Sequence, residues 1–255
     1  MKISGAQAIV VGGASGMARA TAEMLVREGA RVAILDRPSS QGEEVAAALG
    51  AGTCFYPCDV TDFEGIEAAI SHAAGDLGAV HFGVNTAGGG IARRTLAKEG
   101  PHSLDDFRAV IDLNLVASFN IARLQAEAMS RNVPDVNGER GVIVMTASIA
   151  AFEGQIGQVA YSAAKAGIAG MTLTMARDLG SLGIRVMTIA PSLFDTGLTR
   201  GIPQAMADGL TRDAAFPKRM GRPEEYAALA RAIFENPMLN GSTFRLDGGQ
   251  RFAPR

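Results

Sequence analysis

The sequence predicts a single-domain α/β fold: a doubly wound parallel sheet with helices on both faces. Short β-branched runs alternate along the whole chain with stretches whose apolar residues recur at helical spacing. A glycine-rich turn, Gly12 to Ala18, stands between the first run and the first helical stretch. Repeated βα units of this kind form a parallel sheet through right-handed crossovers. No repeat or linker divides the 255 residues, so we expect one domain over 1–255.

Each expected strand is a short run rich in Val, Ile and other apolar residues: 9–11, 31–36, 53–56, 80–84, 141–145, 184–189 and 243–246. Helices are expected between them, where apolar positions repeat at helical spacing: 21–28, 42–49, 63–74, 104–129, 159–179 and 223–234. The last helix starts favourably. Pro223 suits its first turn, and Glu224 and Glu225 complement the positive end of its dipole.

Composition limits the possible partners. The chain has 24 Lys and Arg against 26 Asp and Glu, a balance that argues against a nucleic-acid binder, which normally carries a concentrated basic face. Cys54 and Cys58 are the only cysteines, too few for a disulfide framework, and no histidine cluster accompanies them, so we expect no metal site. We see no signal peptide and no apolar run that could cross a bilayer. A cytoplasmic protein that binds a small molecule is therefore expected.

The turn from Gly12 to Ala18 is typical of a dinucleotide site. Its glycines permit a tight turn and let the backbone approach a pyrophosphate, which the amides and dipole of the helix N-terminus then bind. A glycine cluster alone indicates no more than a turn, but its place between strand and helix favours a site. We expect four residues of this turn to contact the cofactor: Gly12, Ser15, Gly16 and Met17.

Three successive strand ends carry polar or small residues, and ligands bind beyond such ends in open α/β sheets. Asp36 lies about 20 residues after the glycines, where an acid binds ribose hydroxyls and repels a 2′-phosphate. NAD is therefore favoured over NADP, although Arg37 could pair with that phosphate. The next two strand ends are expected to continue this cofactor edge, through Asp59 and Val60 and then through Asn85, Ala87 and Gly88.

Tyr161 and Lys165 stand one helical turn apart, and Ser148 follows the strand at 141–145. A free phenol has a pKa of about 10, which a nearby ammonium and an oxidised nicotinamide would lower. Ser148 can donate a hydrogen bond to a substrate oxygen, and Tyr161 can pass a proton while the nicotinamide passes a hydride. A surface Tyr–Lys pair beside an unrelated serine is the alternative, which the nucleotide turn disfavours.

These residues resemble the short-chain dehydrogenase/reductase family over essentially the whole chain. The resemblance is carried, in the family's order, by Gly12, Gly16, Ala18, Asn85, Ala87, Gly88, Asn114, Ser148, Tyr161, Lys165, Pro191 and Thr196. It implies a Rossmann-type fold in which Asn114 holds a water relay behind Lys165. It also implies that Pro191, Leu193, Phe194 and Thr196 border the nicotinamide. Val11, Ala18 and Ser192 depart from the family pattern, and none of them removes a reacting group.

Segments 146–155, 183–191 and 235–241 look like type-2 3-hydroxyacyl-CoA dehydrogenases, which also act on hydroxysteroids. The resemblance implies an NAD-dependent oxidoreductase that interconverts 3-hydroxyacyl-CoA and 3-oxoacyl-CoA, and a homotetramer. A hydroxysteroid or other secondary-alcohol dehydrogenase is one alternative. A 3-oxoacyl carrier-protein reductase that uses NADPH is another, which Asp36 opposes. A non-catalytic nucleotide-binding scaffold is a third, which the presence of Tyr161 and Lys165 opposes.

The remaining expectations concern the substrate. A lid is expected at about 193–220, with five apolar residues that could line a pocket: Leu198, Met206, Leu210, Phe216 and Met220. The stretch 91–103 resembles an extended loop of the same subgroup. Its basic residues, Arg93, Arg94 and Lys98, are candidates for the coenzyme A phosphates on charge alone.

Overall fold

The computed structural model describes residues 1–50, 52–196 and 209–254. Within these residues, seven parallel strands form one sheet in the order β3-β2-β1-β4-β7-β8-β9. The strands are β1 (Gln7–Val11), β2 (Arg31–Asp36), β3 (Cys54–Pro57), β4 (Phe82–Asn85), β7 (Gly141–Thr146), β8 (Ile184–Pro191) and β9 (Thr243–Leu246). The strand order reverses beside β1, and such a switch point is where doubly wound sheets bind ligands. The predicted fold class is confirmed.

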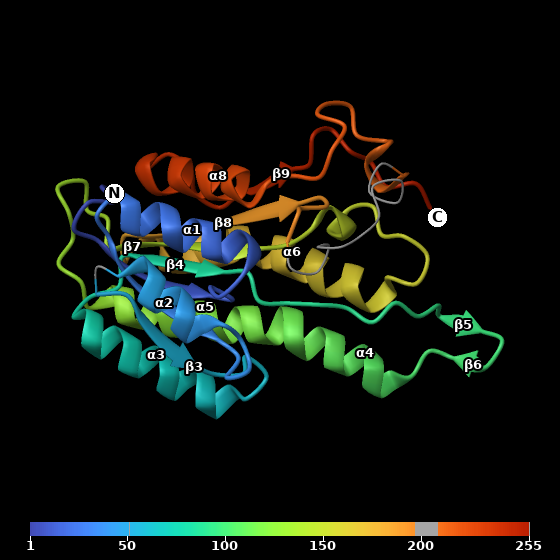
Figure 1. Ribbon diagram of the computed structural model, residues 1–255, viewed down its shortest axis with the longest axis horizontal. Helices are drawn as coiled ribbons and strands as arrows, with labels where there is room; N and C mark the ends of the chain where they lie inside the picture. Colours follow the sequence, from blue (N-terminus) through green and yellow to red (C-terminus); the bar gives the residue numbers. More distant parts are fainter. Residues whose placement is uncertain (51, 197–208, 255) are drawn as a thin grey trace.

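Helices cover both faces of the sheet (Figure 1). One layer holds α1 (Gly16–Arg27), α2 (Gly42–Leu49) and α8 (Pro223–Glu235), and the other holds α3 (Phe63–Leu77), α4 (Leu104–Ile111), α5 (Ala117–Ser130) and α6 (Val159–Gly180). Side chains of β1 alternate between the two layers: Ala8 and Val10 pack in one apolar core, and Ile9 and Val11 in the other. Burial on both faces explains the continuous apolar runs of the central strands.

The helix predicted over 104–129 is interrupted. A π-helical turn, η1 (Asp112–Val116), separates α4 from α5 and contains Asn114, which is fully buried. The Asn114 amide donates to the carbonyl of Val110 at 2.8 Å and to that of Gly89 at 2.7 Å. The apolar spacing is helical on both sides of the turn, so the pattern did not reveal the extra residue that a π turn accommodates.

Three short elements were not predicted. β5 (Leu96–Ala97) and β6 (Gly100–Pro101) form an antiparallel hairpin that projects from the body of the molecule (Figure 1). A 3₁₀ turn, η2 (Ile149–Ala151), follows Ser148. Elements of two or three residues are too short to show a period in the sequence. None of the described helices is long and apolar enough to span a membrane.

Candidate active site

The turn between β1 and α1 is tight, and atoms of Thr86 and Thr196 approach it so closely that a side chain at Gly12 or Gly16 would meet them. Gly12 has a φ of 82°, and a Cβ there would lie 2.7 Å from Oγ1 of Thr86. Gly16 has a φ of 55°, and its Cβ would lie 3.1 Å from Cγ2 of Thr196. The first turn of α1 contains no acidic residue, so the positive end of the helix dipole meets no opposing charge there. These features fit a bound pyrophosphate.

Asp36 lies against this turn. Its Oδ2 accepts the N–H of Ala14 at 3.0 Å, and its Oδ1 accepts the N–H of Arg37 at 2.7 Å. Burial, together with the charges of Asp36, Asp59 and Asp62, raises the pKa of the nearby Cys58 thiol to about 12. The end of the site at β2 and β3 is therefore electronegative.

The other two predicted strand ends make hydrogen bonds and packing contacts within the protein. Asp59 is exposed, and its Oδ1 accepts the N–H of Thr61 at 2.8 Å and its hydroxyl at 2.6 Å, which hold the pKa of that carboxyl low. Val60 is buried in the core. Asn85 exchanges two hydrogen bonds with Gln125, at 3.0 and 2.9 Å, and both side chains are buried. The side-chain amide of Asn85 thus points into the core. That Asn85 contacts the cofactor stays a prediction.

Gly88, Gly89 and Gly90, which follow β4, pack directly on the predicted catalytic residues. Asn114 binds both backbone groups of Gly89, because its Oδ1 accepts the N–H at 3.2 Å and its Nδ2 donates to the carbonyl at 2.7 Å. A Cβ on Gly88 would lie 2.6 Å from Oδ1 of Asn114 and 3.2 Å from Nζ of Lys165. The glycine run therefore lets the backbone approach closely.

The four predicted catalytic residues come together from three elements. Ser148 follows β7, Tyr161 and Lys165 lie on α6, and Asn114 lies in the π turn. The Ser148 hydroxyl hydrogen-bonds with the phenol of Tyr161. Nζ of Lys165 is 5.5 Å from the centre of the Tyr161 ring and donates to the carbonyl of Thr146 at 3.0 Å.

Burial dominates the ionisation of this group. It lowers the pKa of Lys165, which is 3% exposed, to about 8. It also raises the pKa of Tyr161, and the hydrogen bond from Ser148 only partly opposes this. The lowering of the Tyr161 pKa that is expected from Lys165 and an oxidised nicotinamide together stays a prediction for the enzyme with its cofactor bound. At neutral pH the phenol carries its proton and can donate it.

A cavity of about 360 Å³ opens above these residues. Nine residues of the predicted site line it: Met17, Gly88, Ser148, Tyr161, Lys165, Pro191, Leu193, Phe194 and Thr196. It has further lining residues that the sequence analysis did not assign to the site: Thr86, Gly89, Gly90, Ile91, Ala92, Thr146, Ala147, Gln158 and Ser192. The run Gly88-Gly89-Gly90 was a usable signal for two of them, because three glycines at a strand end suggest a close approach of backbone.

Among the described residues of the predicted lid, Leu193, Phe194 and Thr196 line this cavity. Leu198 and Met206 lie outside the described residues. Leu210 and Phe216 are 40% and 84% exposed, and neither they nor Met220 line the cavity. Within the described ranges, no group of three His, Cys, Asp or Glu side chains is placed to hold a metal ion.

Comparison with known proteins agrees with the geometry. Residues 6–207 match the model of the short chain dehydrogenase family. The chain is 50% identical to 3-hydroxyacyl-CoA dehydrogenase type-2 of Homo sapiens, over 99% of this chain and 97% of the relative. It is 34% identical to ipsdienol dehydrogenase of Ips pini, over 98% and 99% of the two chains.

Among solved structures, the 3-hydroxyacyl-CoA dehydrogenase type-2 of Mycobacterium avium superposes with a TM-score of 0.94 at 43% identity, covering 98% of both chains. The family match, the parallel sheet and the Ser–Tyr–Lys geometry indicate an oxidoreductase that acts on a CH–OH group with a nicotinamide cofactor. The chain belongs to the short-chain dehydrogenase family.

Proposed function

We propose that this protein interconverts 3-hydroxyacyl-CoA and 3-oxoacyl-CoA with NAD as its cofactor. The observation that carries the proposal is the cavity in which Ser148, Tyr161 and Lys165 meet, next to the glycine turn and Asp36. Relatives that are about half identical over nearly the whole chain bear the name of that activity.

In this mechanism, the substrate carbonyl oxygen binds between the hydroxyls of Ser148 and Tyr161. Ser148 donates a hydrogen bond that stabilises the charge developing on that oxygen. Tyr161 donates its proton to the same oxygen, since burial keeps the phenol protonated. The ammonium of Lys165 stabilises the resulting phenolate, and Asn114 holds the Gly89 backbone against this group. A bound nicotinamide supplies the hydride, or accepts it when the alcohol is oxidised.

The preference for NAD is proposed on the position of Asp36. Its carboxylate lies beside the glycine turn in an electronegative end of the site, where a 2′-phosphate would be repelled. The test compares the dissociation constants of NADH and NADPH. We expect the wild type to bind NADH at least tenfold more tightly and Asp36→Asn to lose most of that preference. Equal affinity of the wild type for both would contradict the proposal.

Room for a long substrate supports the acyl-CoA class. A second hollow of about 510 Å³ adjoins the active-site cavity and shares Gln158 with it. Arg94 and Ser162 line it, together with apolar residues that include Leu96 and Ile156. Of the basic candidates, Arg93 is ion-paired with Asp106 at 3.0 Å, so Arg94 is the better phosphate partner.

This assignment has a matched control. Arg94→Ala is expected to raise KM for acetoacetyl-CoA severalfold while leaving KM for a ketone without coenzyme A unchanged. Lys98→Ala, on the hairpin between β5 and β6, serves as the control and should change neither KM. Equal effects of the two substitutions would point to charge steering rather than a phosphate contact.

The activity itself is tested by NADH oxidation with acetoacetyl-CoA. We expect rapid turnover by the wild type and none by Tyr161→Phe, which should still bind NADH with nearly unchanged affinity. Full activity of Tyr161→Phe would overturn the mechanism. An inactive wild type that still binds NADH would retain the cofactor site and reject the acyl-CoA substrate.

A secondary-alcohol dehydrogenase without coenzyme A specificity is the second candidate. It is favoured by the likeness to ipsdienol dehydrogenase and by apolar residues in the cavity, such as Ile91, Leu193 and Phe194. An enzyme of this kind would turn over small hydrophobic ketones at least as well as acetoacetyl-CoA.

We further propose that residues 193–220 border the substrate as a lid, on the basis of Leu193 and Phe194.

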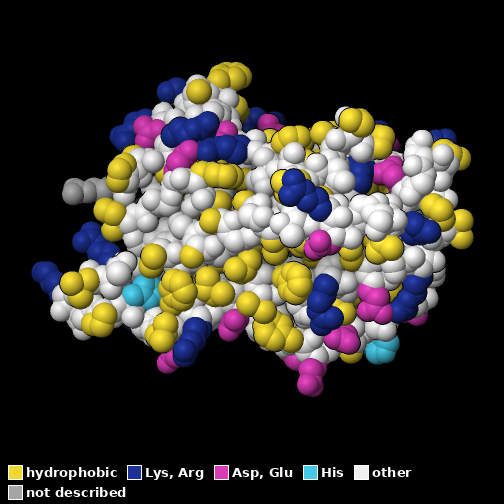
Figure 2. Space-filling view, turned by 180° about the vertical axis from the view of Figure 1, so that it is seen from behind, with side chains coloured by type: hydrophobic (Ala, Val, Ile, Leu, Met, Phe, Trp, Pro, Cys, Tyr) yellow, Lys and Arg dark blue, Asp and Glu magenta, His cyan; other side chains and the backbone are white. Residues whose placement is uncertain are grey.

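We also propose a homotetramer in the cytoplasm. Large apolar side chains are exposed on the outer faces of α5 and α6, including Phe119 at 49% and Leu173 at 46%. Figure 2 shows hydrophobic side chains gathered across the lower part of one face of the molecule. Light scattering after size exclusion would test the assembly, and a monomer would refute it.

A further inference from the structure

Residues 247–254, which we name the C-terminal strap, lie beside the loop that follows Ser148. On one side, Gln155 donates its side-chain N–H to the carbonyl of Ala253 at 3.3 Å, and the N–H of Ile156 donates to Pro254 at 3.1 Å. On the other side, the strap contacts residues 209–217. There the carbonyl of Gly248 accepts the N–H of Phe216 at 3.0 Å. The strap thus joins the loop after Ser148 to residues 209–217.

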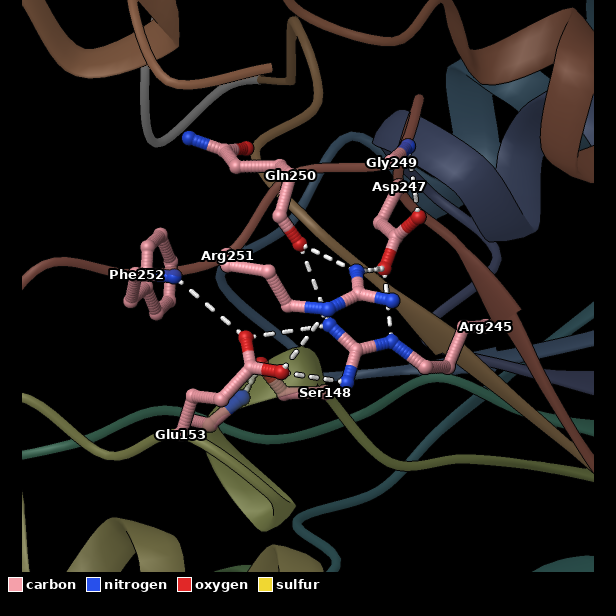
Figure 3. Close-up of polar contacts among 9 residues, drawn as sticks. Ser148, Glu153, Arg245, Asp247, Gly249, Gln250, Arg251 and Phe252 are labelled. Carbon is pink, nitrogen blue, oxygen red and sulfur yellow. Dashed lines mark hydrogen bonds and ion pairs between the residues drawn. The ribbon is translucent and has the colours of Figure 1, made fainter. Parts of the chain in front are cut away.

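Glu153 joins the loop both to the strap and to Arg245 of β9 (Figure 3). Its carboxylate accepts two hydrogen bonds from the guanidinium of Arg245, at 2.6 and 3.0 Å. It also accepts the N–H of Phe252 at 3.3 Å and lies 3.3 Å from Nε of Arg251. These partners lower the pKa of Glu153, Arg245 first among them, so the carboxylate stays charged at neutral pH.

Arg245, which lies at the end of β9, completes the cluster. Its Nε donates to Asp247 at 2.7 Å, and its guanidinium lies 5.2 Å from the centre of the Phe152 ring. Arg251 donates to the same oxygen of Asp247 at 3.1 Å. Figure 3 shows the two guanidinium groups between the two carboxylates, so the cluster is balanced in charge. Bidentate geometry and partial burial make it stronger than an ordinary surface ion pair.

The loop that carries Glu153 begins at the catalytic residue Ser148 and ends at Gln158, which lines the cavity. Ser148 begins the 3₁₀ turn, and its hydroxyl accepts the N–H of Ala150 at 3.1 Å. The N–H of Glu153 donates to the carbonyl of Ile149 at 3.0 Å, which closes the turn. At the far end of the loop, Gln158 accepts the N–H of Gln155 at 3.0 Å and lines the cavity. Hydrogen bonds within the turn therefore link the backbone of Glu153 to that of Ser148, five residues before it.

We infer that Glu153 and Arg245 are positioning residues for the reaction: their ion pair anchors the loop and so fixes the Ser148 hydroxyl at the substrate oxygen. The inference rests on the proposed role of Ser148. Neither Glu153 nor Arg245 lines the cavity, so each acts only through the loop. A misplacement of about 1 Å at a reacting group can cost about a hundredfold in rate, which leaves room for a measurable effect.

The test is Glu153→Gln, which keeps the size of the side chain and removes its charge. We expect kcat with acetoacetyl-CoA to fall about tenfold and the dissociation constant of NADH to change less than twofold, because the cofactor turn lies elsewhere. Glu28→Gln is the control, since Glu28 is paired with Arg231 at 2.9 Å between α1 and α8. It should leave kcat within twofold.

Two further measurements separate positioning from mere stabilisation. In a Ser148→Ala background, Glu153→Gln should change the residual kcat less than twofold, because no hydroxyl remains to be misplaced. Unchanged kcat in the single variant with only a lowered Tm, or an equal tenfold loss in both backgrounds, would overturn the inference. Hydrogen exchange of residues 148–158 should speed up in Glu153→Gln and not in Glu28→Gln, and unchanged exchange would also overturn it. This readout needs no substrate, so it decides the inference even if acetoacetyl-CoA is not turned over.

Discussion

Substitution of Gly88 by Ala should disable the active site through one added methyl group. None of Gly88, Gly89 and Gly90 has a positive φ, so alanine is compatible with the backbone at all three positions. The three substitutions differ only in what the methyl group meets. At Gly88 it meets Oδ1 of Asn114 at 2.6 Å, at Gly90 a ring carbon of Tyr161 at 3.2 Å, and at Gly89 a methyl of Leu113 at 3.6 Å.

The size of the effect follows from these distances. The contact at Gly88 falls short of an ordinary distance of about 3.4 Å by about 0.8 Å. Asn114 cannot retreat freely, because it is fully buried and its side chain makes hydrogen bonds to Gly89 and Val110. We therefore expect kcat to fall between about tenfold and a hundredfold, or about 1.4–2.7 kcal/mol in the activation barrier. The contact at Gly90, at 3.2 Å, is much closer to the ordinary distance, so kcat is expected to fall only about two- to fivefold there.

The assay is steady-state NADH oxidation at saturating substrate, with thermal unfolding to confirm that each variant is folded. Gly89→Ala is the matched control and should keep kcat within twofold, because its methyl group makes an ordinary contact. The reasoning would be refuted if Gly89→Ala lost as much activity as Gly88→Ala, or if Gly88→Ala were as active as the wild type.

Three further predictions concern stability and ionisation. Gln125→Leu leaves two buried polar groups of Asn85 without their partner and should cost about 2–6 kcal/mol of unfolding free energy. The double variant with Asn85→Leu should lose less stability than the sum of the two single variants. Additive losses in denaturant unfolding would contradict this. Burial lowers the Lys165 pKa to about 8 in the folded protein, whereas about 10.4 is expected for the unfolded chain. Between these two pH values the unfolded state therefore binds more protons than the folded state. The stability of the wild type should therefore rise with pH across this range, by up to about 3 kcal/mol relative to Lys165→Met, and equal pH slopes would argue against a desolvated lysine. Tyr226→Phe removes the 2.7 Å hydrogen bond to the Thr146 hydroxyl in the core. It should lower the free energy of unfolding by about 1–3 kcal/mol, measured by urea unfolding. A variant as stable as the wild type would show that the Thr146 hydroxyl finds another partner.

Long elements could be predicted from the sequence because their signals are local. The helix at 42–49 was predicted with the bounds observed for α2, and the helix starting at Phe63 begins where Asp62 caps it, accepting the N–H of Gly65 at 3.0 Å. The strand predicted at 80–84 lies at 82–85 instead, a boundary error of the kind that apolar periodicity leaves. The break between α4 and α5 was missed, because the apolar residues on each side of the π turn are at helical spacing.

The residues of the catalytic group could be predicted from sequence motifs, but their ionisation states could not. The spacing of Tyr161 and Lys165 indicates that they share a helix face, and the structure places them so. It does not indicate how deeply each is buried, and burial decides the direction of both pKa values. Similarly, the partner of Asn85 lies 40 residues away on α5, and no local pattern connects the two amides. The roles of these residues remain predictions for the experiments above.

The π turn at Asp112–Val116 has a consequence for how this chain tolerates insertions and deletions. Each residue of an α-helix turns the chain by about 100°, so deletion of one residue there would restore a regular helix and rotate α4 by that angle relative to α5. At present α4 packs on α6, while α5 packs on β4 and β7. A one-residue deletion would turn one of these apolar faces to solvent and withdraw Asn114 from Gly89. Point substitutions can change this region in small steps. A deletion or insertion of one residue is tolerated only if the apolar faces of α4 and α5 change with it.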